Sequence, residues 1–377
     1  MKKGLIKAVA VMAVCSGGAQ ASTTYRITDL GDLPGGSNYS TATDINNAGQ
    51  VVGYSGTGTG DRAFLWTAGG GMQNLGDLPG GVSVNYSIAN GINDAGQVAG
   101  LSNTYYGSRA FLWSAGSGMQ NLGDLPGGSD DSRAFSINNA GQVVGISNAA
   151  TGERAFLWSA GSGMQNLGDL PGGSDASRAF GINNAGQVVG SSSASTGDRA
   201  FLWSAGSGMQ DLGDLPGGNN SSVAYVINDT GQVAGFSHAA TGLRAFLWSV
   251  GSGMQNLGDL PGGKDSSIAV GINNGGQVVG FSEATAGTHA FLWNSTEGML
   301  DLNSLIDVAD PLRASATLTI ASAINEAGQI VGYGSINGAT HAFMLTPVPE
   351  PENYAMLLSG LGLIGCAARR RNSGFDN

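Results

Sequence analysis

Short apolar runs alternate with clusters of Gly, Asn and Ser along most of the chain. Runs of five or six residues bounded by such turn residues are typical of β-strands. In one stretch the runs are Ala134–Asn138, Gln142–Ser147, Arg154–Ser159 and Met164–Leu170. The third is continuously apolar over Ala155–Trp158, which predicts a strand buried on both faces. Pro171 and Gly172 then suit a type II turn, so the stretch predicts four short antiparallel strands.

This pattern recurs about every 45 residues. All six tryptophans occupy one position of it, in the segment Ala-Phe-Leu-Trp. The motif Leu-Gly-Asp-Leu-Pro-Gly-Gly starts at Leu30, Leu75, Leu122, Leu167, Leu212 and Leu257. The pair Gly-Gln starts at Gly49, Gly96, Gly141, Gly186, Gly231, Gly276 and Gly328. The body therefore contains seven copies of one unit.

Four strands in a unit of 40 to 50 residues are typical of a β-propeller blade. A linear β-solenoid is the alternative, but it needs capping units that the sequence does not show. Tyr25–Gly31 matches the fourth strand of a unit, and His341–Thr346 matches the third strand of the seventh copy. We therefore predict an all-β, seven-bladed β-propeller whose ring is closed by the N-terminal strand, with short apolar helices at both termini.

Composition agrees with a turn-rich β protein. The 377 residues include 65 Gly, and only 11% are charged, which excludes a helical or coiled-coil protein. A hydrophobic content of 41% is too high for a disordered chain. Residues 22–348 carry 10 Lys and Arg against 24 Asp and Glu, so the body is strongly acidic. That charge disfavours nucleic acid and anionic membranes as partners.

The first 21 residues have the layout of a secretory signal peptide. Lys2, Lys3 and Lys7 precede the apolar run Ala8–Val14, and the segment ends in Ala19-Gln20-Ala21. A lipoprotein signal acylated at Cys15 and a buried first helix are the alternatives. Cys15 and Cys366, the two cysteines of the chain, both lie in end segments, so the body has no disulfide framework.

The other end has a second targeting pattern. An apolar stretch, Tyr354–Ala368, is shorter than the ~20 residues that span a bilayer comfortably, and arginines follow it directly. With Pro349, Glu350 and Pro351 before it and Arg369, Arg370 and Arg371 after it, residues 347–377 closely resemble the PEP-CTERM sorting signal of Gram-negative bacteria. The resemblance implies recognition by an exosortase and a transient inner-membrane anchor, a weak transmembrane helix. It also implies removal of the tail and delivery to the outer surface or an exopolysaccharide matrix.

The repeats of residues 22–346 carry a second resemblance. Arg precedes Ala-Phe in five copies, and His289 and His341 take its place in the last two. These units resemble the HAF repeats of predicted extracellular bacterial proteins. That resemblance implies secretion and a repeat architecture, and it implies no activity, cofactor or functional residue.

Few residues suit catalysis or metal binding. The three histidines do not share metal-ligand spacing and no cysteine is left in the body, so we predict no zinc site, no cofactor and no catalytic residue. A Ser-His-Asp triad stays open, although no nucleophile elbow is present. The Asp of the Leu-Gly-Asp motif is expected to bond its own backbone rather than calcium. Better cation candidates are Asp130, Asp131, Asp175 and Asp265.

Comparison of the copies separates two sets of connections. The first-to-second and third-to-fourth turns hardly change, whereas the other two connections vary, and strand alternation places both variable sets on one face. Tyr side chains there suit stacking on sugar rings, and Asn and Asp suit bonding to hydroxyls. The candidate ligand-binding residues are Tyr39, Tyr86, Tyr105, Tyr106, Asp130, Asp131, Asp175 and Asp265. We therefore predict a secreted, non-catalytic surface or exopolysaccharide-matrix protein, structural or glycan-recognising; the alternative is a propeller-fold polysaccharide hydrolase or lyase.

Overall fold

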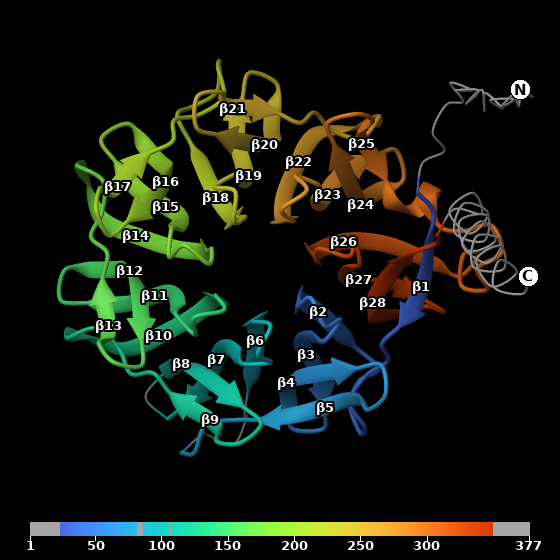
Figure 1. Ribbon diagram of the computed structural model, residues 1–377, viewed down its shortest axis with the longest axis horizontal. Helices are drawn as coiled ribbons and strands as arrows, with labels where there is room; N and C mark the ends of the chain where they lie inside the picture. The colour runs from blue at the N-terminus through green and yellow to red at the C-terminus, as the bar shows by residue number, and fades with distance from the viewer. Residues whose placement is uncertain (1–22, 81–85, 106, 350–377) are drawn as a thin grey trace, which may run out of the picture. The chain divides into compact units, whose positions relative to one another are not determined.

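The computed structural model describes residues 23–80, 86–105 and 107–349. These residues form an all-β structure, in which the one helical element described is a 3-10 turn, η1 (Leu302–Leu305). Antiparallel sheets of four strands are arranged radially around a common axis, as in a β-propeller (Figure 1). The predicted signal segment and the apolar helices predicted at both termini lie outside the described residues.

The strands of each sheet follow one another in the chain, except in the last sheet, which also takes the first strand. The first four sheets contain β2 (Ser40–Ile45), β3 (Val51–Thr57), β4 (Gly60–Thr67) and β5 (Gly71–Gly76); β6 (Ser87–Ile92), β7 (Val98–Thr104), β8 (Gly107–Ser114) and β9 (Gly118–Asn121); β10 (Gly127–Ile137), β11 (Val143–Ala149), β12 (Gly152–Ser159) and β13 (Gly163–Asn166); and β14 (Gly172–Ile182), β15 (Val188–Ala194), β16 (Gly197–Ser204) and β17 (Gly208–Asp211).

The remaining strands continue the same order. They are β18 (Ser222–Ile227), β19 (Val233–Ala239), β20 (Gly242–Ser249) and β21 (Gly253–Asn256); β22 (Gly262–Ile272), β23 (Val278–Ala284), β24 (Gly287–Asn294) and β25 (Gly298–Asp301); and β26 (Ala316–Ile324), β27 (Ile330–Ile336) and β28 (Ala339–Pro347), which β1 (Tyr25–Asp29) joins. A single parallel bridge between Leu243 and Ser266 links the sheets β18–β21 and β22–β25.

The strand bounds of one unit show where local chemistry sets them. The fourth predicted strand, Met164–Leu170, ends at Asn166 in the structure. Gly168 has φ +78°, and its N–H donates to Asn166 Oδ1 at 2.9 Å, so the chain turns there. Leu170 is nevertheless buried, because the connection that follows β13 packs into the core. The strand therefore ends early without exposing its leucines.

The apolar core is divided among the seams between successive sheets. One cluster combines Phe156 and Trp158 of β12 with Ala110 of β8. Phe156 is completely buried, as the continuously apolar run predicts for a strand covered on both faces. Another cluster combines Phe64 of β4 with Val331 of β27, so the first and last sheets also share a seam. Each sheet is thus stabilised by burial against its neighbours.

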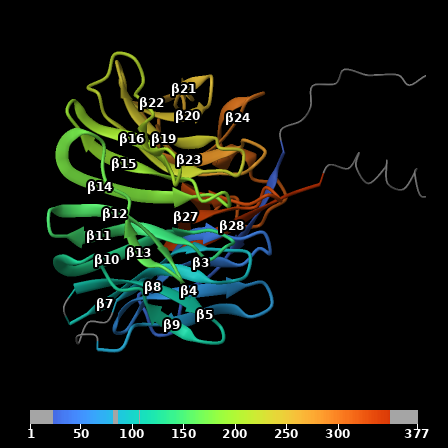
Figure 2. The ribbon, with the colours of Figure 1, turned by 60° about the vertical axis from the view of Figure 1, so that its left-hand side comes forward.

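The first strand lies at the outer edge of the last sheet. β1 pairs antiparallel with β28, with Tyr25 opposite Pro347 and Asp29 opposite Phe343. Tyr25 is only 1% exposed, and the N–H of Ile27 donates to Asp310 Oδ2 at 2.8 Å. Strands from the two ends of the described chain therefore share one sheet, which Figure 2 shows from the side.

Candidate functional site

Each sheet has one innermost strand, and these innermost strands surround the axis and line a channel (Figure 1). They are β2, β6, β10, β14, β18, β22 and β26. Cavities of about 200, 150 and 370 Å³ follow one another along the channel. The cavity of 200 Å³ lies where the strands turn into the next strand, which we call the amide mouth. The cavity of 370 Å³ is lined by residues nearer the strand beginnings, and we call it the aromatic opening.

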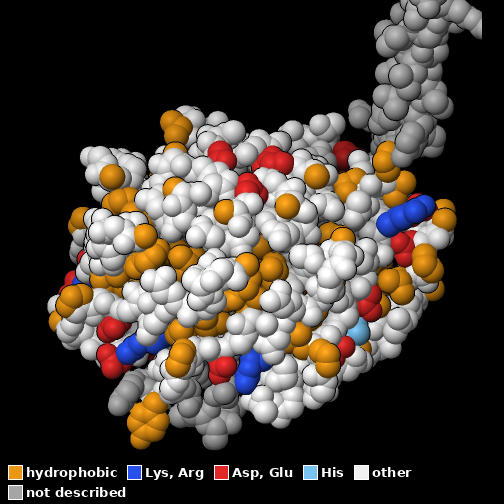
Figure 3. All heavy atoms as spheres, turned by 60° about the horizontal axis from the view of Figure 1, so that its bottom comes forward, with side chains coloured by type: hydrophobic (Ala, Val, Ile, Leu, Met, Phe, Trp, Pro, Cys, Tyr) orange, Lys and Arg blue, Asp and Glu red, His pale blue; other side chains and the backbone are white. Residues whose placement is uncertain are grey.

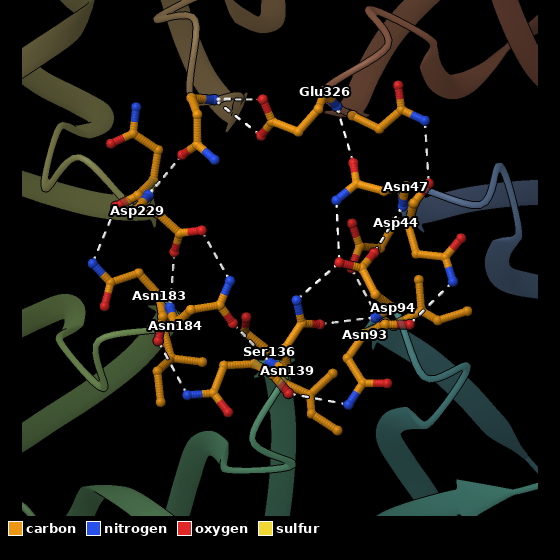
Figure 4. Close-up of a pocket in the computed structure, with 18 of the residues that line it drawn as sticks. Asp44, Asn47, Asn93, Asp94, Ser136, Asn139, Asn183, Asn184, Asp229 and Glu326 are labelled. Carbon is orange, nitrogen blue, oxygen red and sulfur yellow. Dashed lines mark hydrogen bonds between the residues drawn. The ribbon is translucent and has the colours of Figure 1, made fainter.

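A circuit of asparagine side chains surrounds the amide mouth (Figure 4). In every sheet the innermost strand ends in an Ile, and an Asn follows it. Each of these Asn donates from Nδ2 to the backbone carbonyl of the matching Asn in the next sheet, at 3.0–3.3 Å. Asn325 donates to Asn46, which brings the circuit back to the first sheet. The members are Asn46, Asn93, Asn138, Asn183, Asn228, Asn273 and Asn325.

The same carboxamides also hold the turn of their own sheet. Asn183 Nδ2 donates to Gln187 Oε1 at 2.8 Å, and Asn183 Oδ1 accepts the N–H groups of Ala185 and Gln187. Both Nδ2 hydrogens and both lone pairs of Oδ1 are therefore used within the protein. Since the side chain is 3% exposed, it offers nothing to a ligand.

The next residue of each turn makes a second circuit. The N–H of Asn47 donates to Asp94 Oδ1 at 2.9 Å, and the N–H of Asp94 donates to Asn139 Oδ1 at 2.9 Å. Asp94 Oδ2 accepts from Nδ2 of both Asn47 and Asn139. Bonds of this kind continue through Asn184, Asp229, Asn274 and Glu326, and the N–H of Glu326 donates back to Asn47 Oδ1 at 3.1 Å. The amide mouth is therefore hydrogen-bonded mainly to itself.

One carboxyl group lies deeper in the channel. Asp44 Oδ1 accepts the N–H of Ile45, and Oδ2 accepts that of Ile92, both at 2.9 Å. Burial in the channel wall raises the pKa of Asp44 to about 7; the two backbone N–H groups act against the shift and the charge of Asp94 adds to it. For Asp94, burial is outweighed by hydrogen bonds from Asn47 and Asn139, which lower its pKa. The two carboxyl groups thus titrate in different ranges.

The aromatic opening has two unlike sides. Phe135, Phe180 and Tyr225, from three successive sheets, form an arc with ring centroids 5.4 and 5.2 Å apart. Tyr225 is also 5.8 Å from Phe236 of β19. Val270 and Ile320 extend the apolar side, while Thr43, Asn90 and Ser322 supply hydroxyl and amide groups. The opening therefore combines aromatic faces with a polar edge.

The predicted tyrosines do not form one cluster. Tyr39 Oη lies 3.3 Å from Tyr54 Oη and accepts from Thr41 Oγ1, so this hydroxyl already has partners. Tyr86 is half-buried, and burial, followed by the charge of Asp61, raises its pKa. Tyr105 is 73% exposed at the end of β7. Tyr106 lies outside the described residues.

The four acidic candidates each have a cationic partner. Asp130 lies 3.1 Å from Arg109, Asp175 lies 3.3 Å from Arg154, and Asp265 lies 2.9 Å from Arg244. These arginines precede Ala-Phe in their copies and are at least nine-tenths buried. Asp131 pairs with Arg133 at 3.4 Å. Three of the carboxylates therefore hold variable loops to buried arginines, while Asp131 pairs with an exposed one. No group of three His, Cys, Asp or Glu suited to a metal ion occurs in the described part of the chain.

The aspartate of the Leu-Gly-Asp motif differs from expectation in its bonding. The expected backbone bond of this turn comes from Asn166, three residues before Asp169, whereas Asp169 lies 3.9 Å from Arg154. Asp214 and Asp259 likewise pair with Arg199 and Arg244. The reason is the buried guanidinium, which needs a counter-charge more than the turn needs a second acceptor. His289 and His341, in the place of Arg, face Asp301 at 2.8 Å and Asp29 at 3.0 Å.

The loop comparison misses the aromatic opening, because Phe135, Phe180 and Tyr225 lie within strands. Each lies two residues before the Ile that ends the innermost strand, where the other copies have Thr43, Asn90, Val270 and Ser322. A comparison of strand positions would have found this variable position. Asp44, next to it, is also missed, and its counterparts include Gly91 and Ser136.

Charge does not add a further candidate on the side of the molecule drawn in Figure 3. Basic side chains there are few and scattered singly, and acidic ones lie between them. Within residues 23–80, 86–105 and 107–349 there is also no helix with the length and apolar character that crossing a bilayer requires.

A family model for the PEP-CTERM protein-sorting motif matches residues 347–372. The chain is therefore an exported protein with a C-terminal sorting tail, and the motif implies processing by an exosortase. Of the predicted sorting residues, Pro349 is the last described residue, and Glu350, Pro351, Arg369, Arg370 and Arg371 lie outside. The HAF-repeat interpretation stays a prediction.

No curated protein matches the chain. Among solved structures, a puromycin hydrolase is similar at 13% identity with a TM-score of 0.47; the match covers 84% of this chain and 52% of that one, so the chain spans about half of it. The β-propeller domain of the trilobed protease from Pyrococcus furiosus is similar at 10% identity, TM-score 0.38, covering 73% and 98%. The WD40 β-propeller domain of Doa1 is similar at 14% identity, TM-score 0.37, covering 89% and 96%.

Proposed function

We propose that this exported chain is a seven-bladed propeller closed by its N-terminal strand, and that it binds glycan without catalysis at the cell surface or in an exopolysaccharide matrix. The observation that carries the proposal is the difference between the two ends of the channel. The amide mouth keeps one Asn in every sheet, varies the next residue only among Asn, Asp and Glu, and uses both for internal hydrogen bonds. The aromatic opening and the loops around it change from copy to copy.

Two features support the closed ring. β1 supplies the fourth strand of the sheet that β26–β28 would otherwise leave with three. The asparagine circuit also passes through seven residues and returns to Asn46 from Asn325. In such a ring β1 covers the edge of β28, and the sheets keep only short outer edges that could pair with another chain.

Export and surface delivery are supported by the sorting tail. The PEP-CTERM match places the protein among substrates of an exosortase. We propose that the tail anchors the chain in the inner membrane until it is removed, and that the body then stays at the outer surface of a Gram-negative cell or in its matrix. A matrix is rich in polysaccharide, which is the ligand class that an aromatic and amide surface suits.

Polysaccharide cleavage is the second candidate, and one observation favours it. Asp44 and Asp94 line the same cavity, and their pKa values are displaced in opposite directions, as in a general acid beside an ionised carboxylate. Against it, both oxygens of Asp44 accept backbone N–H groups and Asp94 accepts three bonds from Asn47 and Asn139. The pair is therefore engaged in holding the turns.

The test measures binding and cleavage on the same samples. The exported protein is incubated with matrix polysaccharide, and bound material and new reducing or unsaturated ends are both measured. We expect binding without new ends. A variant with Tyr39, Tyr86 and Tyr105 changed to Ala should bind more weakly, while Asn184→Ala at the amide mouth should bind normally. Equal binding by the two variants would contradict the face assignment, and ends that disappear with Asp44→Asn would establish the second candidate.

A further inference from the structure

The aromatic opening is a wide recess that is open to solvent at its end of the channel. Its volume of about 370 Å³ falls within the usual range for small-molecule sites, roughly 300–1,000 Å³. Phe135, Phe180 and Tyr225 face it from β10, β14 and β18, at the same position of three successive units. Their centroid separations of 5.4 and 5.2 Å make one continuous aromatic wall.

Polar atoms of the same pocket lack partners within the described chain. Asn90 uses Nδ2 in a 2.7 Å bond to the carbonyl of Ala134, but its Oδ1 accepts no bond from a described residue. Ser322 Oγ and Tyr225 Oη likewise make no hydrogen bond with the described residues, although Tyr225 is buried enough for burial to raise its pKa. Thr43 differs, because its Oγ1 donates to the carbonyls of Val52 and Ala89. One acceptor and two hydroxyls are thus available to a ligand.

The lining carries no charged side chain. Asp44 supplies a carboxyl group to the wall of the adjacent 150 Å³ cavity, not to that of the aromatic opening. The arginines of β10 and β14 do not supply an unpaired positive charge either, because Arg133 is paired with Asp131 and Arg178 with Glu153. An anionic ligand would therefore lose part of its hydration without gaining a counter-charge, which disfavours its binding. A purely apolar ligand would displace water from Asn90 Oδ1 and Ser322 Oγ without replacing the hydrogen bonds, which also disfavours binding.

We propose that the aromatic opening binds one neutral pyranose residue of a glycan, with the C–H face of the sugar against Phe180 and its neighbours and the hydroxyls toward Asn90 and Ser322. The inference rests on the proposed glycan recognition and names its central subsite. A pyranose fits because it has one apolar face and a rim of hydroxyl groups that donate and accept. The aromatic wall continues from Tyr225 to Phe236 and His238 of β19, at 5.8 and 6.5 Å between ring centroids. The following sugar residues therefore extend outward over β19.

The test uses calorimetric titration of the exported protein with a neutral hexose tetrasaccharide, in β1,4- and α1,4-linked forms, and with a hexuronate tetrasaccharide. We expect a neutral probe to bind and the hexuronate to bind at least tenfold more weakly. Phe180→Ala should weaken binding at least fivefold, Phe180→Tyr should restore it, and Tyr225→Phe, which removes one hydroxyl, should weaken it severalfold. Phe180 is half-buried and faces the pocket, so these variants should keep the fold, which the melting temperature checks.

The outcomes separate this inference from the proposed function. If Phe180→Ala and Tyr225→Phe bind like the unchanged protein while the variant at Tyr39, Tyr86 and Tyr105 loses binding, the pocket assignment is wrong and glycan recognition stands. Preference for the hexuronate would also overturn the pocket assignment. If the unchanged protein binds neither these tetrasaccharides nor matrix polysaccharide, both proposals fail.

Discussion

The two ends of the channel are built from neighbouring positions of the same strands, yet they use their side chains in opposite ways. At the amide mouth, Asn183 places its whole carboxamide in bonds to its own turn and to the next sheet. Phe180, which lies three residues earlier in β14, makes ring contacts with Phe135 and Tyr225 and lines the aromatic opening. The difference lies in how fully the polar groups of a side chain are paired within the protein: those of Asn183 are all paired, whereas the ring of Phe180 has none to pair.

That difference explains which positions stay the same between copies. A carboxamide that holds its own turn and also donates to the next sheet cannot be lost without leaving several polar groups short of a partner. A side chain that faces a cavity meets no such requirement. Variation at the aromatic opening, through Thr43, Asn90, Phe135 and Val270, is what such freedom permits. We therefore expect changes at the amide mouth to affect stability most, and changes at the aromatic opening to affect the proposed recognition.

The largest effect is expected from removing β1, which completes the sheet formed by β26–β28. Deletion of Tyr25–Gly31 removes the buried Tyr25 and Ile27, each worth roughly 1.5–3 kcal/mol of burial, and the ladder to β28. The loss of about 5 kcal/mol approaches the whole stability of many domains. We expect a much lower melting temperature and self-association through the exposed β28, measured by thermal unfolding and light scattering. A monomeric deletion variant of unchanged stability would refute ring closure.

The sequence predicts the positions of such strands well, and it predicts the side-chain contacts in the channel poorly. Repeated Phe and Trp at buried positions, and Gly at turns, predict the four strands of a unit and their burial, because each acts through local geometry or simple hydrophobicity. The partners of Asp130, Asp175 and Asp265 could not be predicted, since the arginines that hold them lie more than fifteen residues away. The arc of Phe135, Phe180 and Tyr225 also depends on how sheets meet around an axis, which the pattern within one unit does not contain.

The second effect tests whether the channel between the two ends is destabilised by a buried charge. The pKa of Asp44 is raised from 3.8 unfolded to about 7 folded, so between these values the folded state holds the extra proton. The free energy of unfolding should therefore fall as pH rises from about 4 to 7 and change little above that, by at most about 4 kcal/mol and by less where channel water solvates the carboxylate. Urea unfolding at several pH values measures it.

Asp44→Ser is the matched variant, because Ser136 occupies the same position two sheets later. We expect it to remove most of the fall in stability between pH 4 and 7 and to be more stable than the unchanged protein at pH 8. The substitution removes the hydrogen bond that Asp44 Oδ2 accepts from the N–H of Ile92. An unchanged pH profile in the variant would show that Asp44 is solvated well enough to ionise normally.

The smallest of the three effects tests the comparison most directly, because it changes the same residue type at each end. Asn183→Ala removes the bonds to Asn228 and Gln187 and the two that its Oδ1 accepts, and it leaves the carbonyl of Asn228 with only the N–H of Gly231 as donor. We expect a loss of about 2–3 kcal/mol in the free energy of unfolding, with glycan binding unchanged. Asn90→Ala removes only one bond, to Ala134, and should cost about 1 kcal/mol or less while weakening binding. Urea unfolding measures the stability of both variants, and calorimetric titration measures their glycan binding. Equal losses of stability, or weaker binding by Asn183→Ala alone, would contradict this division of roles between the two ends.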